Sequence, residues 1–241
     1  MLNRFALAAA PLSLAACVIV VDGAPSDGEL GVDASFGSQS RAEAGEVLAA
    51  EAALEPFNAI EASSGTDVIL TFGEAHTIRL DENAQRRAAY EVEDGTLKVT
   101  CRRRSGWSGN CLRGDRGTLT VTLPRAEALR ASSGAVLTLR EGVVLGDELS
   151  IRASSGAVLT ARGDLGAVAS VEARASSGAS LDARGIDADR GSADASSGAS
   201  VRLGTIRSRL DAEASSGAGV TYEGSPQVER RTSSGGSVRG R

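Results

Sequence analysis

The sequence predicts an all-β protein that folds as a right-handed parallel β-helix, a β-solenoid of stacked coils about 20 residues long. The main observation is that the tripeptide Ser-Ser-Gly occurs seven times, and its last six copies follow one another at intervals of 22, 22, 20, 19 and 18 residues. Aromatic residues make up only 3% of the chain, so the core must be built from Ala, Val, Leu and Ile in thin layers. Short segments in which apolar and polar residues alternate supply the strands.

The N-terminus has the features of an export signal. Asn3 and Arg4 precede an apolar run from Phe5 to Val21, which is typical of a signal peptide. Within this run, the segment Leu14-Ala15-Ala16-Cys17 resembles the lipobox of bacterial lipoproteins. We therefore expect residues 1–16 to be a lipoprotein signal peptide and Cys17 to become the lipidated N-terminus.

Two other interpretations of this segment stay open: an ordinary secretory signal in which Cys17 is incidental, and an uncleaved membrane anchor prolonged by the valines that follow it. Residues 17–54 are expected to form a flexible tether. Within it, the segment from Arg41 to Leu54 is rich in Ala and Glu and favours a short helix. The folded domain is expected over residues 55–241, beginning near Phe57.

Alternating segments predict strands at residues 67–72, 77–80, 90–93, 97–100 and 118–123. The dipeptide Asp94-Gly95 separates the third and fourth of these segments. Asp-Gly between two alternating runs is typical of a tight β-hairpin. No segment after residue 57 has a sustained helical period, so no helix is expected there.

Aligned on Ser-Ser-Gly, the repeats place apolar residues in columns separated by an even number of positions, which puts these columns on one face of a strand. Parallel stacking of the repeats would set like residues above one another and bury that face. The first repeat follows the same pattern, with Ile60, Val68 and Leu70 inward. Two of the columns are Leu137, Leu159, Leu181, Val201 and Val220, and Leu129, Ile151, Ala173, Ala193 and Ala212.

The second serine of each tripeptide has the same parity as the apolar columns, so these serines are expected inside, with their hydroxyl groups bonded from coil to coil. They are Ser133, Ser155, Ser177, Ser197 and Ser216. The glycine that follows permits a bend. A second turn in each coil is expected at Gly142, Gly163, Gly185 and Gly204, which gives about five or six right-handed coils.

The remaining two cysteines, Cys101 and Cys111, flank nine residues. In an oxidising envelope compartment they are expected to form a disulfide. Two cysteines and one distant histidine do not make a four-ligand metal site, so neither a metal nor a cofactor is expected.

Five features occur in an order that resembles a known family. They are Phe57-Asn58-Ala59-Ile60, the valine strand that begins at Asp67, the hairpin strand Asp94-Gly95-Thr96-Leu97-Lys98-Val99, Leu123-Pro124 and the Ser-Ser-Gly series. Together they resemble the bacterial head GIN domain, a family described as a "putative autotransporter adhesin", over about residues 55–241. The resemblance implies a right-handed β-helix-like fold and an envelope location. It brings no catalytic or binding residues with it.

Catalytic patterns are weak in this chain. A Ser-His-Asp site would need His76, the only histidine, with Asp67 or Asp81 as its orienting acid, and no nucleophile motif accompanies it. An enzyme that cleaves carbohydrate could instead draw on acidic residues in successive turns. These are Asp182, Asp187, Asp189 and Asp194, and the competing interpretation is that they keep the solenoid soluble.

One loop has an unusual composition. Arg102, Arg103, Arg104 and Trp107 lie between the two cysteines. Arginine donates paired hydrogen bonds to carboxylate or phosphate, and tryptophan offers a stacking face. The sequence therefore predicts a binding loop for an anionic glycan or phosphate, against the alternative of an exposed hairpin tip with solvated charges.

The net charge of −5 argues against a nucleic-acid binder. We expect a non-enzymatic lipoprotein of the cell envelope, attached to the outer membrane on its periplasmic or its outer face, that binds a polysaccharide or a protein partner as an adhesin. The alternatives are a carbohydrate-active enzyme and a purely structural periplasmic scaffold. The oligomeric state stays open.

Overall fold

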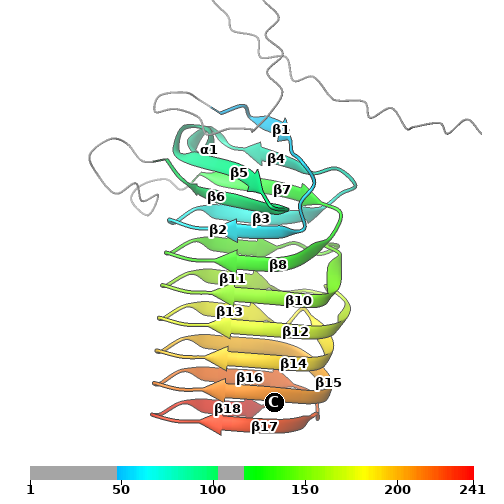
Figure 1. The fold of residues 1–241 in the computed structure, drawn as a ribbon, viewed down its shortest axis with the longest axis vertical. Coiled ribbons are helices and arrows are strands. Elements are labelled where there is room, and N and C mark those ends of the chain that lie inside the picture. The colour runs from blue at the N-terminus through cyan, green and yellow to red at the C-terminus, as the bar shows by residue number, and fades with distance from the viewer. Residues whose placement is uncertain (1–47, 103–116) are drawn as a thin grey trace, which may run out of the picture. The chain divides into compact units, whose positions relative to one another are not determined.

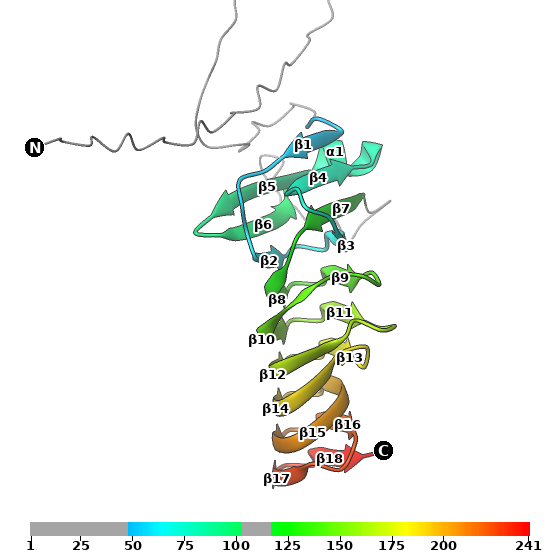
Figure 2. The same ribbon diagram turned by 90° about the vertical axis from the view of Figure 1, so that its right-hand side faces the viewer.

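The fold is described for residues 48–102 and 117–241 of a computed structural model. These residues form a right-handed β-solenoid of about five turns, which confirms the predicted fold class. Two sheets face each other across the core (Figure 2). In Figure 1, one sheet lies in front with its strands running to the left, and the chain returns to the right behind it while it descends.

Sheet A consists mostly of parallel strands. In spatial order they are β1 (Glu51–Ala53), β4 (Thr77–Leu80), β7 (Thr118–Leu123), β3 (Asp67–Phe72), β9 (Val136–Leu139), β11 (Val158–Ala161), β13 (Ser180–Ala183), the first part of β15 (Ser200–Ala214), β16 (Gly219–Glu223) and β18 (Ser237–Gly240).

Sheet B is the opposite wall of the solenoid. Its strands, in spatial order, are β5 (Ala88–Glu93), β6 (Thr96–Cys101), β2 (Ala59–Ala62), β8 (Ala126–Ala131), β10 (Leu145–Ala153), β12 (Ala167–Ala175), β14 (Asp187–Ala195), the second part of β15 and β17 (Gln227–Thr232). Each coil thus has one strand in each sheet, and the predicted strands at residues 67–72, 77–80 and 118–123 are confirmed.

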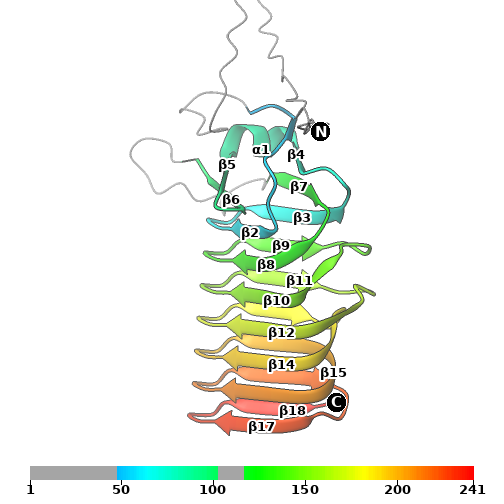
Figure 3. The ribbon, with the colours of Figure 1, turned by 45° about the vertical axis from the view of Figure 1, so that its right-hand side comes forward.

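Every Ser-Ser-Gly forms a tight turn from sheet B to sheet A along one edge of the stack (Figure 3). In the turn that begins at Ser176, Ser177 and Gly178 have φ values of 53° and 70°, and the N–H of Ala179 donates to the carbonyl of Ser176 at 3.1 Å. Positive φ at both central residues is the type I′ geometry. The expected bend at the glycine is therefore confirmed.

Backbone hydrogen bonds connect these turns from coil to coil. The N–H of Gly156 donates to the carbonyl of Ser177, and the N–H of Gly178 donates to that of Ser197, both at 3.0 Å. The expected ladder of buried serine hydroxyls is wrong. The second serines are exposed at the tips of the turns: Ser133, Ser155, Ser177, Ser197 and Ser216.

The opposite edge of the stack absorbs the drift in repeat length. Residues 140–144 and 162–166 join the strands of the longer coils, residues 184–186 join those of the next, and β15 runs from sheet A to sheet B without a break. The turns expected at Gly142, Gly163 and Gly185 are present, whereas Gly204 lies within β15. A Cβ atom on Gly204 would lie 2.4 Å from the carbonyl oxygen of Ile186, so this corner is tight enough to require glycine.

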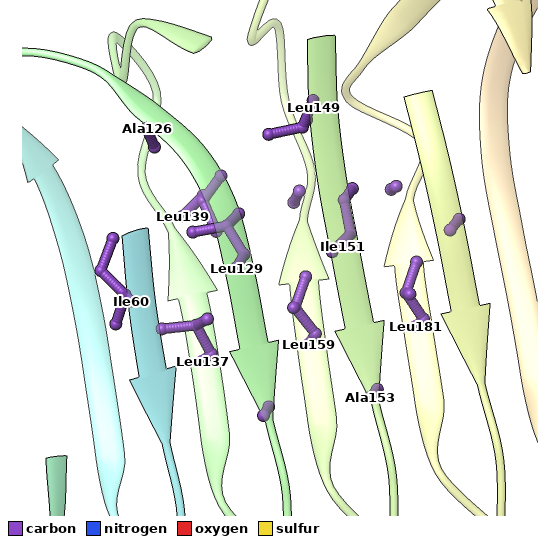
Figure 4. Packing of buried hydrophobic residues seen from close by; sticks show 14 of the residues in the cluster. Ile60, Ala126, Leu129, Leu137, Leu139, Leu149, Ile151, Ala153, Leu159 and Leu181 are labelled. Atoms are coloured by element: carbon purple, nitrogen blue, oxygen red, sulfur yellow. The ribbon is translucent and has the colours of Figure 1, made fainter. Parts of the chain in front are cut away.

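The core consists of the predicted apolar columns. In sheet A, Leu137 pairs with Leu159, and Leu159 pairs with Leu181. In sheet B, Leu129 pairs with Ile151, and Figure 4 shows the two rows facing each other. All of these side chains are buried, and each contributes about 1.5–3 kcal/mol through removal of apolar surface from water.

The N-terminal end of the solenoid has a different topology. The hairpin β5–β6 turns at Asp94-Gly95, where both residues have positive φ, as predicted. β6 then pairs with one edge of β2, and β8 pairs with the other edge. The coil formed by β2 and β3 therefore lies between a later segment of the chain and the rest of the stack.

Three expectations for the N-terminal region are wrong. The segment expected to be helical contains β1, and ordered structure begins before Phe57, since Leu48 is buried. A short helix, α1 (Glu82–Arg87), was not expected. Asp81 caps it by accepting the N–H of Ala84 at 2.8 Å. Within the described ranges, no helix has the length and apolar character that a membrane crossing requires.

The last coil departs from the core pattern. Arg230 pairs with Ala212 and thus occupies the column in which earlier coils have Leu, Ile or Ala. Its Nη2 donates to the hydroxyl of Tyr222 at 2.8 Å. A charged residue that points inward at a sheet edge disfavours pairing with a further strand.

Sheet A also contains one buried ion cluster. The carboxylate of Asp182 is only 4% exposed. It accepts hydrogen bonds from Arg162 at 2.6 and 2.8 Å and from Arg184 at 2.9 and 3.0 Å. Burial alone would raise the pKa of Asp182, but the hydrogen bonds from the two arginines outweigh it and lower the pKa from 3.8 to about 2.

A substitution in one turn tests the left-handed conformation. We expect Gly178→Ala to lower the free energy of unfolding by about 1 kcal/mol, because alanine is strained at positive φ. A Cβ atom at this position meets no atom within 4 Å, so no steric clash contributes. Gly178→Asn should lose less, since asparagine tolerates this conformation. Urea unfolding of both variants measures the difference; equal losses would contradict the account.

The ion cluster predicts a pH dependence of stability. The pKa of Asp182 is lower in the folded state than in the unfolded state, so its contribution is present above about pH 4 and is lost as the pH falls toward 2. Asp182→Asn should be less stable than the wild type at pH 6, and this difference should shrink by about 2 kcal/mol at pH 2.

Asp189→Asn is the control for this experiment, because the Asp189 carboxylate is 59% exposed. Its stability at pH 6 should be close to that of the wild type, because an exposed ion pair contributes little to stability. Denaturant unfolding at pH 2, 4 and 6 compares the three proteins. A constant difference for Asp182→Asn would show that the cluster does not stabilise the fold through ionisation.

Candidate functional site

A groove of about 380 Å³ crosses sheet B beside the row of Ser-Ser-Gly turns. Five adjacent strands contribute to it, namely β2, β8, β10, β12 and β14. In most coils the lining consists of a charged residue, the alanine that ends the strand and the first serine of the turn. The lining residues are Glu61, Arg130, Ala131, Ser132, Arg152, Ala153, Ser154, Arg174, Ala175, Ser176, Asp194 and Ser196.

The register of sheet B produces a ladder of charged residues along this groove. Arg130 pairs with Arg152, and Arg152 pairs with Arg174. Glu61 precedes this series and Asp194 follows it. Neighbouring strands lie about 4.8 Å apart, so three arginine side chains leave the sheet at that interval, with a carboxylate at either end.

Like charges on directly opposite residues repel one another, and one carboxylate partly offsets this repulsion. Glu172 accepts from Arg152 at 3.2 Å and contacts Arg174 at 2.5 Å. Burial would raise the pKa of Glu172, but hydrogen bonds from Arg152 and Ser150 and the charge of Arg174 lower it overall. Glu172 is therefore ionised at neutral pH.

Arg130 differs from the other two arginines. Like Arg174 it is exposed, but neither a hydrogen bond nor an ion pair connects its side chain to the part of the chain that the structure describes. Its five N–H donors are thus open to a solute in the groove. Arginine donates two parallel hydrogen bonds to a carboxylate, so this residue is suited to an anionic group.

The geometry of the groove does not suit glycoside hydrolysis. Its two carboxylates, Glu61 and Asp194, are four strands apart, which is about 19 Å. Paired catalytic carboxylates lie about 5–10 Å apart. Glu172 lies closer to both, but the arginines hold its pKa low, whereas a general acid needs a raised pKa.

The acidic residues proposed for an enzyme lie in different environments. Asp182 is buried in its ion cluster in sheet A. Asp187 and Asp189 both contact Arg207 at 3.4 Å, and Asp194 lies in the groove in sheet B. Of these four residues, the structure brings only Asp187 and Asp189 together, and it places both beside the positive charge of Arg207.

The contacts of the His76 side chain are with Phe57. Its ring packs edge-on against Phe57 with ring centres 5.0 Å apart, and its Nε2 lies 3.0 Å from the carbonyl oxygen of the same residue. Asp81 accepts the N–H groups of Ala84 and Thr118. Neither group belongs to the groove.

Most of the predicted arginine loop lies outside the described residues, including Arg103, Arg104, Trp107 and Cys111. Arg102 is half-buried, and its Nε donates to the carbonyl of Ala88 at 2.9 Å. Cys101 is buried at the end of β6. The disulfide and the binding loop therefore stay predictions, as does Cys17, which also lies outside the described residues.

The register explains where that loop occurs in the fold. Ala62 in β2 pairs with Val99 in β6, and Asp67 in β3 pairs with Thr118 in β7. The chain between β6 and β7, most of which lies outside the described residues, thus connects the same two sheets as the short turn at Ser63. This relation could not be predicted from the sequence, because β6 and β7 join the stack out of chain order.

The groove itself was missed, although the sequence contains a signal for it. The pentapeptide Arg-Ala-Ser-Ser-Gly occurs three times, beginning at Arg130, Arg152 and Arg174. The residue before the alanine column points outward in every coil, so a repeated arginine at this position predicts a ladder of guanidinium groups.

Comparison with solved structures identifies the same fold in proteins of known bacterial origin. A crystal structure of a "putative adhesin" from Bacteroides fragilis has a TM-score of 0.61 and 13% sequence identity, and the match covers 86% of this chain and 98% of that one. Another "putative adhesin", from Parabacteroides merdae, has a TM-score of 0.50 and 16% identity, with coverage of 82% and 97%. At these identities the likeness shows the fold alone.

No curated protein matches the sequence. A family model, however, matches residues 56–226, which is most of the solenoid. The order of sequence features, the coil stack and this match agree, and the protein belongs to the family described as "Putative auto-transporter adhesin, head GIN domain".

Proposed function

We propose that the protein is a non-enzymatic binding module of adhesin type, held in the bacterial cell envelope by a lipid on Cys17, that binds a glycan through the groove on sheet B. The observation that carries this proposal is the open groove across five coils, lined by arginine and serine. Its side chains project from strands of a hydrogen-bonded sheet, and such rigid positions suit a preorganised binding site. The family description supports an adhesin-like role.

The envelope location rests on the N-terminal sequence. The lipobox at Leu14-Ala15-Ala16-Cys17 supports lipidation, and a disulfide between Cys101 and Cys111 would suit an oxidising compartment. We propose attachment to the outer membrane. Display on the cell surface would suit an adhesin, whereas a periplasmic position would favour an envelope partner.

One experiment separates binding from catalysis. The chain from residue 17 onward, without its lipid, is incubated with immobilised envelope and host polysaccharides. Both the retention of the protein and the release of reducing ends are measured. We expect retention on at least one acidic polysaccharide without release. Release that Asp194→Asn abolishes would favour the enzyme alternative, and neither retention nor release would favour the scaffold.

Lipidation is tested by fractionating cells that express the wild type or Cys17→Ser. We expect the wild type in the membrane fraction, labelled by an alkyne fatty acid, and the variant in the soluble envelope fraction without label. Membrane association and processing that the substitution leaves unchanged would contradict lipidation at Cys17. Protease treatment of intact and lysed cells then distinguishes the two faces of the outer membrane.

A further inference from the structure

We propose that Arg130, Arg152 and Arg174 form a subsite for an acidic oligosaccharide whose carboxylates face the arginine ladder and whose chain lies along the coil stack. This inference rests on the proposed function and names its ligand class. The three arginines are in register on adjacent strands. Their interval of about 4.8 Å is comparable to the length of one sugar residue in an extended chain.

Serine hydroxyls accompany the arginines on the side of the turns. Ser132, Ser154 and Ser176 line the same groove and are half-buried. Their hydroxyl groups have no hydrogen-bond partner within residues 48–102 and 117–241. A row of hydroxyls that can donate and accept complements the hydroxyl groups of a sugar chain, whereas a lone phosphate or carboxylate would leave most of the row unused.

The charges at the ends limit the length of the acidic segment. Glu61 and Asp194 flank the ladder, and they would repel a polymer with a carboxylate on every sugar residue along all five coils. A segment of about three residues fits between them, as does a chain with sparser carboxylates. Nucleic acid is disfavoured, because no aromatic residue lines the groove for base stacking.

Glu172 competes with the ligand in this arrangement. Its carboxylate contacts both Arg152 and Arg174 and thus occupies the place that a bound carboxylate would take. Removal of its charge should therefore strengthen binding. This direction is diagnostic, because structural damage to the groove would weaken binding instead.

The test uses titration calorimetry on the chain from residue 17 onward, without its lipid. It measures the affinity for trimers of galacturonate, glucuronate and mannuronate, and for the same trimers with their carboxyl groups reduced. We expect at least one acidic trimer to bind and its reduced form to bind at least tenfold more weakly. Arg130→Gln should weaken binding by about tenfold, the effect of losing a charge-assisted hydrogen bond. Glu172→Gln should strengthen it, and added salt should weaken it.

Arg190→Gln is the matched control. Arg190 lies on β14 of the same sheet, is exposed, and makes no ion pair with the described part of the chain. It is about 13 Å along the strand from Asp194, so its loss should change the affinity less than twofold. Equal effects of Arg130→Gln and Arg190→Gln, equal binding of reduced and acidic trimers, or no binding of any trimer would overturn the inference.

The outcomes also separate this inference from the proposed function. Retention of the wild type on a polysaccharide that Arg130→Gln binds equally well would leave the binding module standing and remove the arginine subsite. Loss of all retention in the wild type would remove both. Displacement of the bound trimer by inorganic phosphate at equal concentration would show that the ladder recognises a simple anion and would overturn recognition of an oligosaccharide.

Discussion

The coil-to-coil hydrogen bond between the Ser-Ser-Gly turns is the constraint on which this structure depends. Two consecutive residues in the left-handed region, such as Ser177 and Gly178, reverse the chain in the smallest space, and the glycine N–H binds the next turn. This bond fixes the ends of neighbouring strands relative to one another. A slip of one residue would turn every core side chain to the solvent, so the turns set the register of both sheets.

The same register accounts for the core and for the groove. It places Leu159 beside Leu137 on the inside and Arg152 beside Arg130 on the outside. The coils shorten from 22 to 18 residues along the chain. The change falls at the edge opposite the turns and at register shifts in the parts of the strands away from the turns. The groove runs beside the constant edge, where repeated sequence produces repeated side chains at a fixed interval.

Much of this fold could be predicted from the sequence, because the strands are local and alternate. The column that begins with Leu137 and the hairpin at Asp94-Gly95 were both found in this way. The prediction that the second serines point inward was wrong, because alternation holds only in an extended chain. Two consecutive left-handed residues in each turn break the alternation, as at Ser133. The strand order at the N-terminal end could not be predicted for another reason. There β6 and β8 pair with opposite edges of β2, and pairing between segments so distant in the sequence leaves no local sequence pattern. The arginine ladder of the groove could have been predicted, since three Arg-Ala-Ser-Ser-Gly segments repeat an arginine at the same outward position. The ion pairs of Glu172 could not, because they depend on which strands pair and in which register.

A pair of deletions measures the dependence on register most directly. Removal of residues 151–172 joins Ser150 to Ala173 and takes out one coil in phase, because Ala173 is the residue that pairs with Ile151 in the neighbouring coil. Removal of residues 151–171 leaves one extra residue in the strand and would turn Leu149 outward. We predict that the first variant unfolds cooperatively in urea and keeps its strand signal in circular dichroism, and that the second loses both. Equal behaviour of the two variants would contradict the claim that in-register stacking determines this fold.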